Sequence, residues 1–244
     1  MTGLYEQRLR RIRQLSPGFP EAGPILKLYV PLLRLQSEIY EAGLPAAAGP
    51  APLLSYVATL RKLAAQFGPA PLRHAAEPTE QEFTAFWHGH REYREGSQFY
   101  LRALLQPWVE RLRTMTPASD QEWAAGEGCP FCSAPPAAAV LRPGGDSGQR
   151  SLACSLCAGE WPFKPVSCPT CGETDPELLP CYRSEEIPQV QVEACDTCRC
   201  YLKTIDLRAD HDAIPVVDEL VTISLNLWAE ESGYRKREPN LFGM

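Results

Sequence analysis

The sequence predicts an α+β protein, in which an N-terminal helical domain precedes two tandem zinc-ribbon-like metal-binding modules and a closing C-terminal helix. Three observations predict this fold class. Apolar residues recur at helical spacing over residues 1–115. All ten cysteines lie between Cys129 and Cys200, and eight of them form four C-x-x-C pairs. Apolar residues return to helical spacing after the last cysteine.

The N-terminal part is predicted to be a bundle of helices separated by proline- and glycine-rich breaks. One apolar stripe consists of Leu28, Leu32, Leu35 and Ile39. Thr79 and Glu82 have the spacing of a capping box, and we expect Gly96 or Pro107 to break or kink the helix that follows. The helical segments are expected at 4–15, 25–42, 53–67 and 79–115.

The second half is expected to contain short strands between the cysteine pairs. A connector is predicted at 117–128, and a final helix at 216–231 ends at Gly233. Strands are expected at 138–141, 189–193 and 201–207, and the final helix places Val217, Leu220, Val221, Leu227 and Trp228 on one face. The predicted domains are 1–118 (helical), 125–164 (first module), 165–210 (second module) and 211–244 (closing helix and tail).

The four cysteine pairs have the spacing of two four-thiolate metal sites. A C-x-x-C turn brings two thiolates to one ion, and two such turns complete a tetrahedron. Joining consecutive turns leaves 21 residues inside the first site, 23 inside the second and 10 between the sites. The second half of the cysteine region repeats the first. Its leading C-x-x-C pair lies 39 residues, and its trailing pair 41 residues, after the corresponding pair of the first half. The predicted metal ligands are Cys129, Cys132, Cys154, Cys157, Cys168, Cys171, Cys195 and Cys198.

Other arrangements of these cysteines are possible from spacing alone. The turns can pair in an interleaved order, as in cross-braced fingers, and a lone C-x-x-C also fits a redox-active dithiol. Cys200 lies two residues beyond Cys198 and is an alternative ligand. We interpret both Cys181 and Cys200 as small apolar fillers without a metal role. Gly172 follows the third turn, where a positive φ is expected, and Ser133 takes that place after the first turn.

Composition and charge exclude several functional classes. No apolar run approaches the roughly 20 residues of a membrane helix, and no signal-peptide core develops near the N-terminus, so we expect a cytoplasmic protein. Residues 129–210 carry 7 basic and 11 acidic side chains, which argues against a zinc ribbon that binds nucleic acid. No nucleophile–base set or phosphate loop stands out, and we therefore expect a non-enzyme.

The residues around the cysteines resemble the FdhE family of formate dehydrogenase accessory proteins. The resemblance rests on Cys-Pro-Phe-Cys at 129–132, Gly-Gln-Arg-Ser-Leu-Ala-Cys-Ser-Leu-Cys-Ala-Gly-Glu-Trp at 148–161, Cys-Pro-Thr-Cys-Gly at 168–172 and Cys-Asp-Thr-Cys-Arg-Cys-Tyr-Leu-Lys at 195–203. It continues through 216–234, which ends in Glu-Glu-Ser-Gly-Tyr. Two positions depart from the family pattern, since Ser133 replaces a glycine and Cys200 a non-cysteine.

The resemblance implies a fold, a metal and a partner. It implies that the two modules are rubredoxin-like and that each holds iron, whereas spacing alone favours zinc. It also implies a protein that binds the catalytic subunit of formate dehydrogenase during maturation. An electron carrier or thiol redox protein is the alternative from another class, because a rubredoxin-like iron site can exchange one electron.

Overall fold

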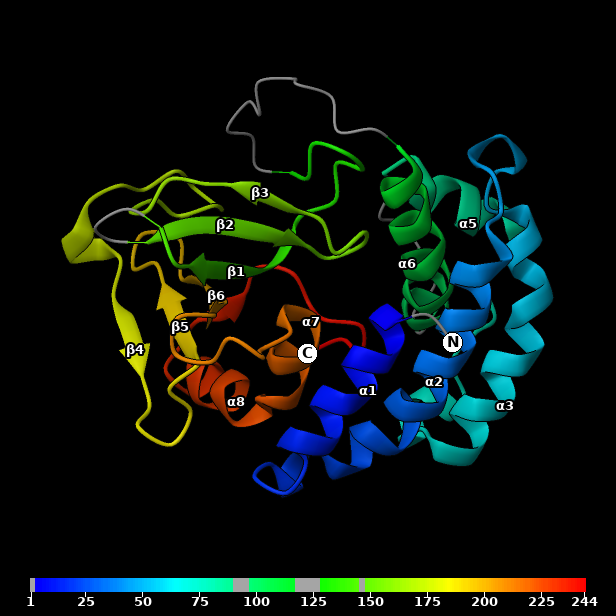
Figure 1. The fold of residues 1–244 in the computed structure, drawn as a ribbon, viewed down its shortest axis with the longest axis horizontal. Coiled ribbons are helices and arrows are strands. Elements are labelled where there is room, and N and C mark those ends of the chain that lie inside the picture. The colour runs from blue at the N-terminus through cyan, green and yellow to red at the C-terminus, as the bar shows by residue number, and fades with distance from the viewer. Residues whose placement is uncertain (1–2, 90–96, 117–127, 145–147) are drawn as a thin grey trace. The chain divides into compact units, whose positions relative to one another are not determined.

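The computed structural model describes residues 3–89, 97–116, 128–144 and 148–244. The chain divides into two compact units, shown in Figure 1. The helical unit contains residues 1–119 with 241–243, and the sheet unit contains residues 120–240 with 244. Gly96 and all of the predicted connector except Gly128 lie outside the described residues. The finer domain boundaries given above stay predictions.

The helical unit has helices where the apolar periodicity predicted them. The stripe of Leu28, Leu32, Leu35 and Ile39 is buried, and its helix, α2, packs against α1, α3 and α6. The elements are α1 (Gly3–Leu15), η1 (Pro20–Ala22), α2 (Gly23–Ala42), η2 (Ala46–Ala48), η3 (Ala51–Tyr56), α3 (Val57–Phe67), α4 (Ala70–Arg73), α5 (Glu80–Trp87) and α6 (Ser97–Met115).

The stretch from 79 to 115, predicted to be helical with a break or kink at Gly96 or Pro107, forms the two helices α5 and α6, and Pro107 does not break the second. The capping box is present, because Glu82 N donates to Thr79 Oγ1 and Thr79 N donates to the Glu82 carboxylate. Helix α6 continues through Pro107. A proline has no N–H to offer the carbonyl four residues before it. Gln36 Nε2 supplies the missing donor, at 2.9 Å from Ala103 O.

A buried ion pair joins the first and last helices of this unit. Arg8 donates to both oxygens of Glu110, at 2.5 and 3.1 Å, and Tyr5 Oη donates to the same carboxylate at 3.1 Å. Both charged side chains are almost fully buried. Because Arg8 and Glu110 neutralise each other, neither of these two buried charges is left unpaired between α1 and α6.

The sheet unit is built around one continuous sheet. Its order is β3-β2-β1-β6-β5-β4, with β7 also paired to β6. Each cysteine module supplies an antiparallel three-stranded part, and the parallel pair β1–β6 joins the two parts. The strands are β1 (Pro136–Arg142), β2 (Gln149–Cys154), β3 (Glu160–Pro162), β4 (Cys181–Arg183), β5 (Val190–Ala194), β6 (Cys200–Asp206) and β7 (Arg235–Lys236), and η4 (Pro176–Leu178) precedes β4.

The predicted closing helix is two helices, α7 (Pro215–Val221) and α8 (Ile223–Glu231). The break lies at Thr222, where ψ is 58°. Val217, Leu220 and Val221 are buried as expected, and α8 ends before Gly233, whose φ is +81°. The prediction that Leu227 and Trp228 share their face is wrong, since these side chains are 55% and 38% exposed. Because the helix is interrupted at Thr222, the residues of α8 do not continue the helical periodicity of α7, and its Leu227 and Trp228 do not extend the buried face of α7.

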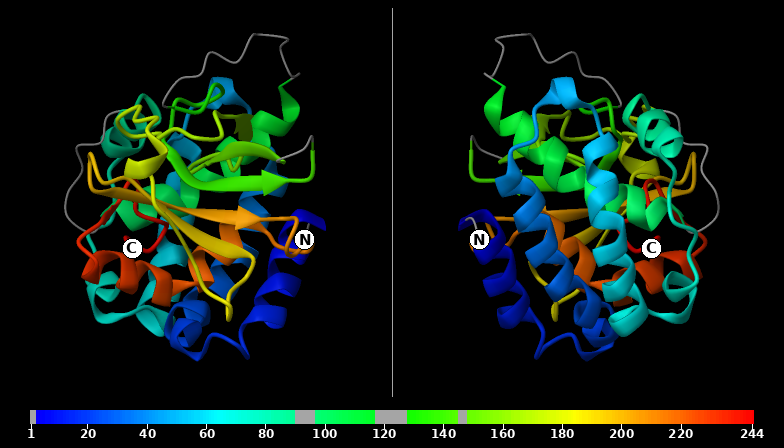
Figure 2. Two further views of the ribbon diagram at one scale, coloured as in Figure 1. Left: turned by 90° about the vertical axis from the view of Figure 1, so that its left-hand side faces the viewer. Right: turned by 90° about the vertical axis from the view of Figure 1, so that its right-hand side faces the viewer.

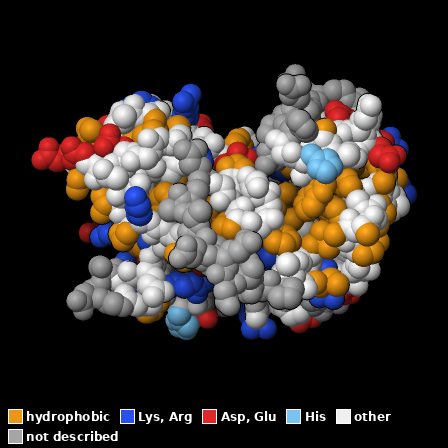
Figure 3. Space-filling view, turned by 90° about the horizontal axis from the view of Figure 1, so that it is seen from above, with side chains coloured by type: hydrophobic (Ala, Val, Ile, Leu, Met, Phe, Trp, Pro, Cys, Tyr) orange, Lys and Arg blue, Asp and Glu red, His pale blue; other side chains and the backbone are white. Residues whose placement is uncertain are grey.

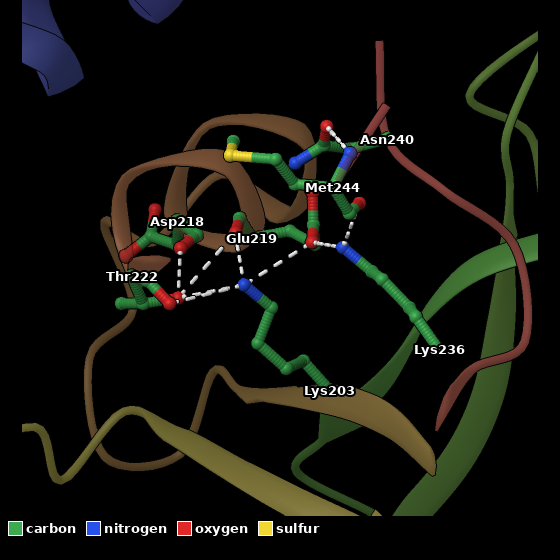
Figure 4. A network of polar contacts seen from close by, with 7 residues as sticks. All are labelled: Lys203, Asp218, Glu219, Thr222, Lys236, Asn240 and Met244. Atoms are coloured by element: carbon green, nitrogen blue, oxygen red, sulfur yellow. Dashed lines mark hydrogen bonds and ion pairs between the residues drawn. The ribbon is translucent and has the colours of Figure 1, made fainter. Parts of the chain in front are cut away.

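A buried polar network explains the break (Figure 4). The Lys203 side chain is fully buried, and its Nζ donates to the carbonyl oxygens of Glu219 and Thr222. These carbonyls lie at the end of α7, where a continuing helix would otherwise use them. Glu219 also pairs with both Lys203 and Lys236. The network therefore ties α7 to β6 and β7.

Candidate metal centres

The four C-x-x-C turns share one backbone conformation. In each turn the N–H of the first cysteine donates to the carbonyl oxygen five residues later, at 2.8 or 2.9 Å. The residue after the second cysteine has a positive φ in every turn. These residues are Ser133 (57°), Ala158 (52°), Gly172 (77°) and Arg199 (57°). The prediction of a positive φ at Gly172 is confirmed, and Ser133 adopts the same conformation without being glycine.

Backbone amides of the turns point at the cysteine sulfurs. Leu156 N and Cys157 N lie 3.3 and 3.4 Å from Cys154 Sγ. Thr170 N lies 3.4 Å from Cys168 Sγ. Donors aimed at sulfur favour the thiolate, which is the form that binds metal.

The first cluster consists of Cys129, Cys132, Cys154 and Cys157. One turn precedes β1 and the other follows β2, and the antiparallel pairing of these strands brings both turns to the same end of the hairpin. The Sγ atoms of Cys129 and Cys157 are 3.6 Å apart, and those of Cys132 and Cys154 are 3.4 Å apart. All four sulfurs lie within 4.8 Å of one another.

The second cluster consists of Cys168, Cys171, Cys195 and Cys198, and the β4–β5 hairpin builds it in the same way. Its Sγ pairs are 3.8 Å (Cys168 and Cys198) and 3.6 Å (Cys171 and Cys195) apart. The two clusters differ in exposure. Three cysteines of the first are buried, whereas Cys171 of the second is exposed and Cys198 is intermediate.

Each cluster has the donor set and the spacing to hold a metal ion. Four thiolates at the usual metal–sulfur distance of about 2.3 Å have sulfurs roughly 3.8 Å apart, which is close to the separations found here. Hydrogen bonding to the sulfurs of Cys129 and Cys132, together with burial, holds the pKa of the Cys154 thiol well above its usual range. A cation at the centre would favour the thiolate form of all four cysteines and so offset this rise in pKa.

The structure brings the eight predicted ligands together in sequential order and not in the interleaved one. Cys181 and Cys200 belong to neither cluster. Cys200 is buried, as expected of a small filler, and its carbonyl oxygen accepts from Cys195 N. The same interpretation is wrong for Cys181, which is exposed on the edge strand β4.

The exposure of the second cluster leads to a prediction about metal release. We expect a water-soluble chelator to remove one ion per chain from the metal-loaded protein well before the other, because Cys171 gives it access to the second cluster. After partial removal, the metal content would be measured, and the cysteines whose thiols have become reactive would be identified by labelling. Early labelling of Cys171 and Cys198 is expected. Labelling of Cys129 and Cys132 first would contradict the prediction.

The positive φ angles lead to a second prediction. A non-glycine residue in this conformation costs about 1 to 2 kcal/mol, part of which a glycine recovers. We therefore expect Ser133→Gly to raise the free energy of unfolding by about 0.5 to 1 kcal/mol. Gly172→Ala should lower it by a similar amount, since a Cβ there meets no atom within 4 Å and only the backbone is strained.

Denaturant unfolding of the metal-loaded protein would measure both changes. Ala209→Gly is a suitable control, because Ala209 is exposed and its φ is not positive. This variant should be slightly less stable than the unchanged protein. Stabilisation by Ala209→Gly equal to that by Ser133→Gly would refute the conformational explanation.

Comparison with known proteins places both clusters in one family. A model of the FdhE central domain matches residues 128–164, and a model of the FdhE C-terminal domain matches residues 166–242. The crystal structure of the FdhE protein from Pseudomonas aeruginosa superposes with a TM-score of 0.73 at 26% identity, over 98% of this chain and 95% of that one. The chain belongs to the FdhE family.

The chain aligns with different shares of two curated FdhE relatives. The Protein FdhE homolog of Aquifex aeolicus is 31% identical over 147 residues, which are 60% of this chain and 52% of that relative. The chain thus spans about half the length of that homolog. The Protein FdhE homolog of Pseudomonas aeruginosa is 28% identical over 279 aligned positions, 98% of this chain and 89% of that relative. Among the described residues of this FdhE chain, no helix combines the length and apolarity needed to cross a membrane.

Proposed function

We propose that the chain is a cytoplasmic accessory protein needed to form active formate dehydrogenase, and that it binds the catalytic subunit during maturation. Membership of the FdhE family supports this role, since the resemblance described above is to accessory proteins of that enzyme. The chain acts by binding and catalyses no reaction of its own. The observation that best supports the proposal is the pair of four-cysteine clusters in the sheet unit, because both clusters lie within the residues that match the FdhE family models.

We propose that each cluster holds one iron ion. Four sulfurs within 4.8 Å support a tetrahedral thiolate site, which accepts iron or zinc. The rubredoxin-like character implied by the family favours iron. The two turns at the end of each hairpin would hold the ion through their four cysteines, and the amides aimed at Cys154 and Cys168 would stabilise the thiolates. The visible spectrum of freshly purified protein decides between the metals, since ferric thiolate is red and zinc thiolate colourless.

A rubredoxin-like electron carrier or thiol redox protein is the second candidate. The exposure of Cys171 favours it, because an electron donor can approach the second cluster from solvent. A cavity of about 400 Å³ also reaches Cys168 and Cys195. Protein loaded with zinc in place of iron separates the two roles. Maturation by the zinc form supports a structural metal, and loss of maturation with intact folding supports electron transfer.

A zinc ribbon that binds nucleic acid is less consistent with the charge. Residues 129–210 carry an excess of acidic side chains, whereas phosphate binding requires a basic face. We therefore propose no nucleic-acid partner.

Complementation tests the proposed role. Cells that lack their own FdhE protein and express this chain are expected to recover formate dehydrogenase activity, and cells that express Cys168→Ser or Cys129→Ser are not. Protein levels would be measured in parallel. Full activity with a stably expressed, metal-free variant would exclude a metal-dependent role, and no recovery with a soluble, metal-loaded chain whose partner is present would refute the proposed function.

A further inference from the structure

The sheet unit has an open edge at β4. Among the residues that the structure describes, this strand ends the sheet and pairs only with β5, and the left-hand view of Figure 2 shows it in yellow at the edge of the sheet. Pro180 O accepts from Ala194 N, so alternate residues on this segment direct their backbone groups at β5. The backbone groups of Cys181 and Arg183 therefore face outward, where another extended segment can pair with them.

Exposed apolar side chains gather beside this edge. Among the described residues, Leu178, Tyr182, Leu227 and Trp228 are four of the six exposed large apolar side chains. The Tyr182 and Trp228 rings are 4.6 Å apart, which places α8 against the edge strand. Leu178 ends η4, which precedes β4 in the chain. Exposed apolar side chains that cluster in this way mark an interaction surface, whereas single ones scattered over a protein do not. We call these four residues and the β4 backbone the β4–α8 surface.

Carboxylates outnumber basic groups among the exposed charges around the β4–α8 surface, where Arg183 on β4 is also exposed. Exposed carboxylates lie on the turn after β4 (Glu185, Glu186) and at the end of α8 (Glu230, Glu231). Glu231 is one helical turn from both Leu227 and Trp228, so it borders the apolar patch directly. In Figure 3, which is seen from above, a further group of acidic side chains lies at the left-hand end of the molecule. A partner with basic side chains would complement this surface.

Next to the β4–α8 surface, one arginine of the chain itself lies against an aromatic ring. The Arg199 guanidinium lies 4.1 Å from the centre of the Tyr234 ring and 2.6 Å from Asp196. Tyr234 continues the aromatic row, since its hydroxyl lies 3.3 Å from that of Tyr182 and donates to Asp196 at 2.7 Å. An aromatic face beside a carboxylate is a binding site for a guanidinium or ammonium group. Trp228 and Glu231, three residues apart on α8 and both exposed, offer the same two kinds of group to solvent.

We propose that the β4–α8 surface binds an extended segment of a partner protein that carries an arginine or lysine among apolar residues. The segment adds a strand to β4 through the backbone of Cys181 and Arg183. Its basic side chain lies against Trp228 and Glu231, and its apolar side chains cover Tyr182 and Leu227. Backbone pairing supplies affinity in such a complex, and the side-chain contacts supply selectivity. The identity of the partner as the formate dehydrogenase catalytic subunit rests on the proposed function.

Titration calorimetry with a blocked pentapeptide tests the surface by itself. The probe is acetyl-Val-Arg-Thr-Arg-Val-amide, and the matched peptide has glutamine in place of each arginine. We expect saturable binding of the arginine peptide to the full, metal-loaded chain and binding of the glutamine peptide weaker by roughly three- to fivefold. Trp228→Ala and Glu231→Lys should each lower the affinity of the chain for the arginine peptide by a similar factor. Equal affinity for both peptides, or no saturable binding, would overturn the proposal.

Control variants separate this site from general effects of charge and apolarity. Met115→Ala removes another exposed apolar side chain, and Glu21→Lys reverses another exposed charge. Both should bind the peptide as the unchanged protein does. Thermal unfolding of each variant shows whether the sheet unit remains folded. If Trp228→Ala destabilises it, Glu231→Lys, which alters only an exposed side chain, still decides the outcome.

The same variants with the formate dehydrogenase catalytic subunit distinguish the two proposals. Binding of the subunit by the unchanged chain and weaker binding by Trp228→Ala and Glu231→Lys support both. Equal binding by all variants overturns the docking surface and leaves the proposed function intact. Peptide binding without subunit binding supports the surface and refutes the proposed partner. A lower molecular mass for Trp228→Ala in light scattering would assign the surface to a second copy of the chain and overturn the proposal.

Discussion

Replacing Cys168 or Cys195 with serine is expected to remove one of the two metal ions and to unfold much of the second module. Both sulfurs lie in the second cluster, and each comes from a different turn of the β4–β5 hairpin. A serine hydroxyl is a poor ligand for a site that selects thiolate. Structural four-thiolate sites contribute on the order of 10 kcal/mol to folding, so the loss of one ligand should exceed most other single substitutions.

The measurements are metal content per chain and the free energy of unfolding. We expect the metal content to fall from about two ions to about one, as the two clusters of four cysteines imply. Cys129→Ser should have a parallel effect on the first cluster. Because β1 pairs with β6, the loss of either site should also weaken the strand pairing that joins the modules.

Cys181→Ser is the matched control, since it makes the same chemical change outside both clusters. An exposed substitution of this kind usually changes stability by less than about 0.5 kcal/mol. Cys181→Ser should therefore keep both ions. Retention of two ions by Cys168→Ser, or loss of one by Cys181→Ser, would contradict the ligand assignment.

Local signals in the sequence predicted much of the sheet unit and its clusters. The C-x-x-C spacing predicted which turns combine, because a hairpin brings consecutive turns together. Gly233 predicted the end of α8, and the Thr79–Glu82 spacing predicted a helix start. Each of these features depends on residues close together in the chain.

The features that the sequence missed depend on distant residues. Helix α7 ends before Thr222, and Lys203, 16 residues before Glu219, donates to the Glu219 carbonyl oxygen that Ile223 N would take in a continuous helix. Helix α6 passes through Pro107 because Gln36, 67 residues before Ala103, supplies a donor. The parallel pair β1–β6 joins the two modules through strands that no local pattern relates. The positive φ of Ala158 and Arg199 was also missed, although its signal is local, since each residue follows the second cysteine of a turn.

Replacing Glu219 with glutamine is the second substitution for which we expect a large loss of stability. The Glu219 carboxylate is shared by two buried ammonium groups, at 3.1 Å from Lys203 and in a shorter contact with Lys236. Burial alone would raise its pKa, but the two lysines outweigh this and lower the pKa of Glu219 to about 2. An uncharged amide leaves two buried cations without their counter-charge. The expected cost is about 3 to 5 kcal/mol.

Glu160→Gln is the control for this substitution, because it removes a carboxylate from a more exposed ion pair of the same sheet. Arg142 and Glu160 are 2.8 Å apart, with side chains 49% and 27% exposed. Such pairs contribute about 1 kcal/mol or less. A loss of stability in Glu219→Gln no larger than in Glu160→Gln would show that the buried network contributes little.

Lys203 should also make the stability of the protein depend on pH above neutrality. Burial lowers its pKa from 10.5 to about 7, although Glu219 acts in the opposite direction. Between these two values the unfolded chain keeps the proton that the folded chain releases. The free energy of unfolding contributed by this group therefore rises with pH from about 7 to 10.5, by at most about 1.4 kcal/mol per pH unit.

The comparison of the unchanged protein with Lys203→Met isolates this contribution, since the other titrating groups are common to both. Denaturant unfolding at pH 7, 8 and 9 should give a smaller rise with pH in the variant than in the unchanged protein. Identical slopes would mean that Lys203 stays protonated in the fold, held by Glu219 and by the carbonyl oxygens of Glu219 and Thr222. The network would then be a permanent ion cluster joining β6 to α7, and the loss in Glu219→Gln should lie at the upper end of its expected range.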